Sequence, residues 1–159
     1  MGNIFSGSEI LEIGIQIEAN GKAFYEALVA KAQNKSAQEI FSFLAAEEAR
    51  HISVFQGMLA KVEKSVPAES YPEEFSEYMK ELASEHIFTK KDRGAEIARA
   101  IKTDKEAIEK GISFEKDSIV FYEGMKKVIP SYDYKAVEGL IEQEKLHLIK
   151  LTDLAKAIK

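Results

Sequence analysis

The stretch Glu-Ala-Arg-His at residues 48–51 and the stretch Glu-Lys-Leu-His at residues 144–147 each place a glutamate and a histidine three positions apart. That spacing puts both side chains on one face of an α-helix. Apolar residues repeat alternately three and four positions apart on either side of each pair, which is the pattern of a buried helix face. They are Phe41, Leu44, Phe55 and Met58 around the first pair, and Val137, Leu140, Leu151 and Leu154 around the second. Both pairs are therefore predicted to point into the core of a helical protein.

Two further apolar faces are each interrupted by a single glutamate. Residues 14–18 read Gly-Ile-x-x-Glu and precede a Phe-Tyr pair at 24–25, and the same pattern recurs at 111–115 and 121–122. A Glu-x-x-His pair then follows at nearly the same offset in both halves of the chain. We interpret the halves as two related helical hairpins with a pseudo-two-fold axis.

Three prolines, at positions 67, 72 and 130, divide the chain because proline cannot continue a helix interior. The predicted long helices span residues 8–32, 36–64, 103–129 and 131–158. Each is roughly 35–45 Å long at about 1.5 Å per residue, a length typical of helix bundles. The predicted fold class is all-α, a four-helix bundle with a long crossover at residues 65–102 between the second and third helices. Short helices are predicted near 74–86 and 95–101 within the crossover.

Composition limits the partners and the location of the protein. The 159 residues, 45% of them hydrophobic, are predicted to form one domain spanning residues 1–159. A formal net charge of -5 and the lack of a basic block argue against nucleic acid or a membrane surface as the partner. No stretch has the roughly 18 apolar residues of a membrane span, and the N-terminus lacks the layout of a signal peptide. We therefore expect a cytoplasmic protein.

The four core glutamates require a compensating positive charge. They lie near the middle of their predicted helices and so fall in one layer, where buried carboxylates repel one another. Two divalent cations would neutralise four carboxylates. The chain contains no cysteine, so such metals would need oxygen and imidazole ligands.

Two-metal carboxylate proteins have a characteristic ligand pattern: one glutamate from each of two helices and a Glu-x-x-His pair from each of the other two. The predicted metal ligands are Glu18, Glu48, His51, Glu115, Glu144 and His147. Glu48 and Glu144 are the expected bridges, because each also pairs with a histidine of its own helix.

Four other residues share the face of the ligands. Tyr25 and Tyr122 follow Glu18 and Glu115 by seven residues, about two helical turns, and are either hydrogen-bond partners of ligands or amphipathic core residues. Gly21 and Ser118 each lie three residues after a ligand glutamate. Their small size predicts either an opening for water, peroxide or dioxygen, or close helix packing.

Three polar residues near this pattern are given no metal role. Glu47 and Glu142 lie beside ligand glutamates but off the core stripe, so a solvated face is expected for both. His86 lies in the crossover outside the repeat, where an ordinary surface or partly buried histidine is expected.

Four motifs resemble those of the rubrerythrin branch of the ferritin-like superfamily. They lie at residues 18–25, 47–51, 114–118 and 144–147, and the resemblance covers almost the whole chain. It implies an oxygen-bridged site for two iron ions that reduces hydrogen peroxide or dioxygen, commonly in a homodimer. Iron oxidation is the related ferritin activity. Manganese or a mixed-metal site would use the same ligand types.

The sequence departs from the family pattern at two points. Ser118 stands where typical rubrerythrins carry a further glutamate, and no cysteine-containing rubredoxin module is present, so electrons would need a separate donor protein. The leading hypothesis is a di-iron oxidoreductase. The alternatives are iron oxidation and sequestration, as storage or compartment cargo, and an oxygenase acting on an organic substrate.

Overall fold

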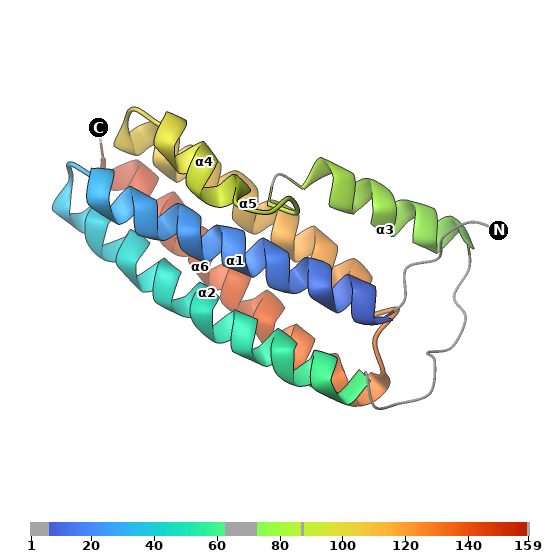
Figure 1. Cartoon of the computed structure of the whole chain (residues 1–159). Helices are drawn as coiled ribbons and strands as arrows, with labels where there is room; N and C mark the ends of the chain where they lie inside the picture. The colour runs from blue at the N-terminus through green and yellow to red at the C-terminus, as the bar shows by residue number, and fades with distance from the viewer. Residues whose placement is uncertain (1–6, 63–72, 87, 159) are drawn as a thin grey trace.

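The computed structural model describes residues 7–62, 73–86 and 88–158, and the regular elements in these ranges are helical (Figure 1). The helices are α1 (Gly7–Lys31), α2 (Lys35–Val62), α3 (Glu73–Glu85), α4 (Arg93–Ala100), α5 (Asp104–Met125) and α6 (Tyr134–Ala157). The predicted end of the second helix at residue 64 and the start of the crossover, residues 65–72, lie outside the described residues.

The four long helices form the predicted bundle. α1 packs against α2 and α5 packs against α6, and each pair is an antiparallel hairpin with a short connection. The two hairpins meet where α2 contacts α6 and α1 contacts α5. The crossover helices lie along the outside of the bundle, with α4 on α1 and α3 on α5 (Figure 1). The all-α bundle with a crossover between α2 and α5 is therefore confirmed.

The boundaries around Pro130 differ from the prediction. α5 ends at Met125 rather than at residue 129, and the amides of Lys127 and Val128 donate to carbonyls three residues back, at 3.2 and 3.0 Å. An α-helix ends before Pro130 because proline disfavours helical backbone in the preceding residue, and here the last turn tightens first. Residues 131–133 form a 3-10 turn, so α6 begins at Tyr134 instead of residue 131.

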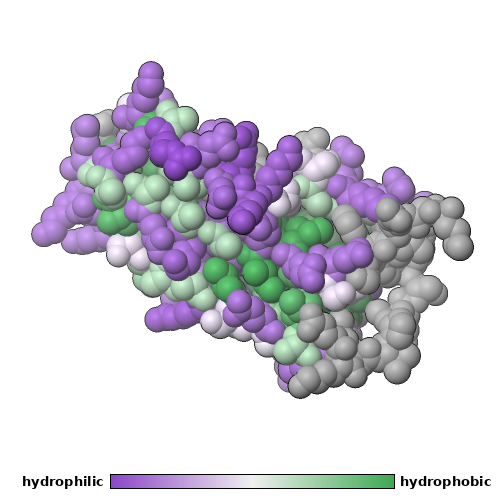
Figure 2. All heavy atoms as spheres, in the orientation of Figure 1, coloured by the Kyte–Doolittle hydropathy of each residue, from purple (hydrophilic) through white to green (hydrophobic). Residues whose placement is uncertain are grey.

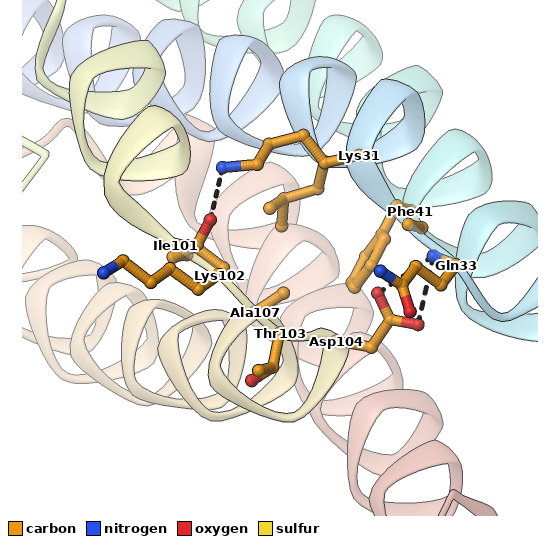
Figure 3. A pocket seen from close by; sticks show the side chains of 10 residues that line it. Lys31, Gln33, Phe41, Ile101, Lys102, Thr103, Asp104 and Ala107 are labelled. Atoms are coloured by element: carbon orange, nitrogen blue, oxygen red, sulfur yellow. Dashed lines mark hydrogen bonds between the residues drawn. The ribbon is translucent and has the colours of Figure 1, made fainter.

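One end of the bundle is closed by a polar junction around a small cavity (Figure 3). The Lys31 ammonium, at the end of α1, donates to three backbone carbonyls at the C-terminal end of α4, those of Ala98, Arg99 and Ile101. The Asp104 carboxylate accepts from the backbone amides of residues 33 and 34, at 3.2 and 2.8 Å. Lys31 thus binds carbonyls at the C-terminal end of α4, and Asp104 fixes the α1–α2 loop to the start of α5.

The middle of the crossover is held to α1 by one buried side chain. The Asn20 amide nitrogen donates to the carbonyl oxygens of Phe88 and Lys90, both at 2.6 Å. Its amide oxygen accepts from the backbone amide of Gly94 at 3.0 Å. Asn20 lies two residues after Glu18, so these bonds place the crossover directly beside the layer of core glutamates.

Figure 2 shows the surface of the molecule in the orientation of Figure 1. Hydrophilic residues surround a band of hydrophobic ones near the middle of this face. Among the described residues, no helix is both long enough and apolar enough to cross a membrane.

Gly94→Ala is expected to destabilise the protein by about 1–3 kcal/mol, the usual effect of overpacking. A Cβ at Gly94 would lie 1.9 Å from the backbone oxygen of Asn20. Gly139→Ala is the matched control, because Gly139 lies within α6 and a Cβ there meets nothing within 4 Å. Alanine at that position should stabilise by about 0.5–1 kcal/mol. Chemical denaturation measures both changes, and an unaltered stability of Gly94→Ala would contradict the close approach of α4 to α1.

Candidate metal centre

All six predicted ligands meet in the middle of the bundle, and each long helix contributes at least one. The carboxylates of Glu18, Glu48, Glu115 and Glu144 are fully buried, and the two histidines are at most 2% exposed. The side chains come from α1 (Glu18), α2 (Glu48 and His51), α5 (Glu115) and α6 (Glu144 and His147). The glutamate layer that the sequence predicts is therefore present.

The six side chains form two overlapping groups, each with potential ligand atoms within 4.8 Å of one another. The first group is Glu18, Glu48, His51 and Glu144, and the second is Glu48, Glu115, Glu144 and His147. Glu48 and Glu144 belong to both groups. The arrangement thus offers two adjacent positions, each with one histidine, one glutamate of its own and two shared glutamates.

Most ligand atoms in this centre lack a hydrogen-bond partner. The unpartnered buried atoms include Glu18 Oε2, Glu115 Oε2, both carboxylate oxygens of Glu48 and Glu144, and the Nδ1 atoms of His51 and His147. His51 Nδ1 lies 2.8 Å from Glu144 Oε1 without hydrogen-bond geometry. Two lone pairs at that separation need a proton or a cation between them. The oxygen and imidazole donors therefore fit a pair of divalent cations.

The pKa values reflect this crowding. Burial, followed by repulsion from neighbouring carboxylates, raises the pKa of Glu48, Glu115 and Glu144. Burial also acts to raise the pKa of Glu18, but its contacts with Glu48 and His51 outweigh burial and lower it to about 2. Burial acts to lower the pKa of His51, yet the nearby carboxylates of Glu144 and Glu18 raise it to about 11.

Two tyrosine hydroxyls link the hairpins at the centre. Tyr25 of α1 donates to Glu115 Oε1 of α5 at 2.7 Å, and Tyr122 of α5 donates to Glu18 Oε1 of α1. Both rings are fully buried, and burial followed by the nearby carboxylates raises the pKa of each hydroxyl, so each stays a donor. Each tyrosine thus orients a glutamate of the other hairpin.

The outward nitrogen of His51 also has a partner. His51 Nε2 lies 2.7 Å from Gln143 Oε1, and because an amide oxygen only accepts, Nε2 carries the proton and Nδ1 faces the carboxylates. The sequence pattern does not single out Gln143. The one feature of the sequence that could have indicated its role is its position directly before Glu144, on the flank of α6 that faces α2.

Glu47 occupies the corresponding position on α2, and the prediction of a solvated face for it is wrong. The residue is 8% exposed, one carboxylate oxygen pairs with Arg50, and the other lies 4.0 Å from His147 Nε2. Helical periodicity does not show that α6 covers this flank of α2. Glu142 is exposed and ion-paired with Lys145, as expected.

His86 and Gly21 also differ from expectation. His86 is only 3% exposed, and its Nε2 lies 3.2 Å from Ser118 Oγ, so it is a buried neighbour of the ligand face. Burial lowers its pKa to about 4. At Gly21 a Cβ would lie 2.6 Å from the Phe114 ring, so close packing rather than an opening explains that glycine.

The pKa shifts predict how the metal-free protein responds to pH. The raised pKa values of Glu48, Glu115 and Glu144 favour the folded state when these groups are protonated, and this stabilisation is lost as pH rises. The raised pKa of His51 also makes stability fall as pH rises above the ordinary histidine value of 6.5. The lowered pKa of His86 makes stability rise with pH, but only below 6.5. The free energy of unfolding of the metal-free protein should therefore fall from about pH 6.5 to 8.5.

Denaturation in the presence of a chelator measures this fall. Protons and metal compete for the same ligands, so the metal-loaded protein should not lose stability over this range. Equal slopes with and without metal would contradict the assignment of the shifts to this centre.

Comparison with known proteins agrees with this geometry. The family model described as Rubrerythrin matches residues 9–155. A solved structure from Thermotoga maritima, assigned as that of a ferritin-like diiron-carboxylate protein, is 28% identical with a TM-score of 0.71 and covers 98% of each chain. A search of curated proteins found no match. From the matched residues and the shared bundle, we conclude that this chain belongs to the rubrerythrin family and has a ferritin-like fold.

Proposed function

We propose that this protein is a di-iron carboxylate oxidoreductase that reduces hydrogen peroxide or dioxygen. The observation that carries the proposal is the pair of overlapping ligand groups that share Glu48 and Glu144. Six buried side chains supply the ligands, and each has at least one ligand atom without a hydrogen-bond partner among the described residues. Membership of the rubrerythrin family favours iron over manganese or a mixed site. Two ferrous ions held there would supply the two electrons that cleavage of the peroxide O–O bond requires.

The chain's own residues would hold and orient these ligands and exclude bulk water. The hydroxyls of Tyr25 and Tyr122 fix Glu115 and Glu18, and Gln143 fixes the tautomer of His51. Buried phenylalanine rings surround the centre, including Phe55 against Tyr122. Such an apolar surrounding strengthens charge interactions with anything that enters the centre.

The proposed partners are an electron donor and a second copy of the chain. With no cysteine it has no thiolate ligand for an iron–sulfur or rubredoxin-type centre, so a separate electron-donor protein is proposed. A homodimer remains our proposal for the assembly, from the family resemblance.

Iron oxidation and sequestration is the second candidate function. The observation that favours it is Ser118, which stands where typical rubrerythrins have another glutamate. Without that glutamate, repeated turnover with peroxide would be slow, whereas a single oxidation that serves storage does not need it.

Two metal ions per chain should be found by metal analysis of protein purified without oxygen. Glu144→Ala should remove most of both ions, because Glu144 belongs to both ligand groups. Glu142→Ala is the matched control, since Glu142 is exposed and, among the described residues, forms an ion pair with Lys145 only. A single zinc ion per chain that survives Glu144→Ala would contradict the two-metal centre.

Stopped-flow mixing of the diferrous protein with peroxide and with dioxygen tests the reaction. One peroxide and two protons should oxidise both ferrous ions of one chain and yield two waters. Turnover should continue only when a reductant is supplied. Oxidation of iron far beyond two ions per chain, with the iron retained in a large closed particle, would favour sequestration instead.

A further inference from the structure

The crossover brings a histidine against the ligand face of α5. His86 follows the last residue of α3, is almost fully buried, and lies with its ring centroid 5.8 Å from that of Phe114. The Phe114 ring in turn fills the space beside Gly21, where a Cβ would also lie 3.2 Å from Glu48 Oε2. His86 therefore packs against a ring that lies close to the ligand Glu48.

The hydrogen bonds of His86 define its tautomer. The backbone amide of Phe88 donates to His86 Nδ1 at 3.1 Å, so Nδ1 carries a lone pair. The proton of the neutral ring is then on Nε2, which donates to Ser118 Oγ at 3.2 Å. Asn20 holds the carbonyls of Phe88 and Lys90, so the loop that presents this amide is itself fixed to α1.

Ser118 lies between two groups that face the centre. It follows Glu115 by three residues and precedes Tyr122 by four, so all three side chains share one face of α5. The Tyr122 hydroxyl reaches Glu18 on α1, and Ser118 is fully buried. Its side chain thus lies on the buried face of α5 that also carries the ligand Glu115 and the Glu18 partner Tyr122.

The Ser118 hydroxyl keeps one unused hydrogen. Its oxygen already accepts from His86, and none of the hydrogen bonds found among the described residues gives its hydrogen an acceptor. A hydroxyl oriented in this way can donate a hydrogen bond to a ligand that enters the centre and carries a lone pair.

We propose that Ser118, oriented by His86, is a binding residue that donates a hydrogen bond to a small anionic ligand such as hydroperoxide or azide. The inference rests on the proposed function, because the ligand would enter the metal centre. His86 acts as a positioning residue through Ser118 and does not touch the ligand. The site has no counterpart on the other hairpin, where Gly21 offers no hydroxyl and Phe114 occupies the space.

Azide titration of the diferric protein tests this proposal, with the absorption change giving the dissociation constant. Ser118→Ala should weaken azide binding by about ten- to hundredfold, the effect of losing one hydrogen bond to a charged group. Ser118→Thr keeps the hydroxyl and should restore most of the affinity. His86→Phe keeps a ring but loses the donor, and should weaken binding less than Ser118→Ala does, because the hydroxyl remains without its orientation.

Ser113→Ala is the matched control, since Ser113 is an exposed serine on the same helix. It should bind azide as the unmodified chain does. If Ser118→Ala and His86→Phe hold two irons and bind azide with unchanged affinity, the inference is overturned while the proposed function stands. If the unmodified chain holds no pair of iron ions, both are overturned together.

Discussion

The four glutamates in the middle of the bundle are removed from water and held close together, and the rest of the structure depends on how their repulsion is balanced. Protons balance it in the metal-free protein, which is why burial and mutual repulsion raise the pKa of Glu48, Glu115 and Glu144. Metal ions balance it without protons. The tyrosine donors and the Gln143 amide provide partners for only some of the ligand atoms. The remaining carboxylate oxygens and histidine nitrogens need a proton or a cation.

The features that could be predicted from sequence are those set by local periodicity. An apolar stripe interrupted by Glu48 and His51 defines both a helix and its buried face, and the repeat around Glu18 and Glu115 supplies the matching helices. The family resemblance rests on the same residues, and the match over residues 9–155 confirms it.

Contacts between elements that are distant in sequence could not be predicted in this way. The sequence predicts a surface or partly buried histidine at position 86, because nothing near it indicates that Asn20 fixes the following loop through Phe88, 68 residues along the chain. Glu47 lies off the stripe of its own helix, yet α6 covers it. Helical periodicity assigns a face to each residue and does not identify the neighbouring helix, so residues on the flanks of α2 and α6 were misjudged or missed.

The division of the ligands between the hairpins has a consequence for how the protein matures. α1 and α2 carry Glu18, Glu48 and His51, and α5 and α6 carry Glu115, Glu144 and His147. Each hairpin is built from contacts between neighbours in sequence, which form quickly during folding. Neither hairpin alone contains a complete ligand group, because both groups draw on both hairpins. Assembly of the centre is therefore tied to the docking of the two hairpins, so the first hairpin on its own has no complete ligand group with which to hold a metal ion.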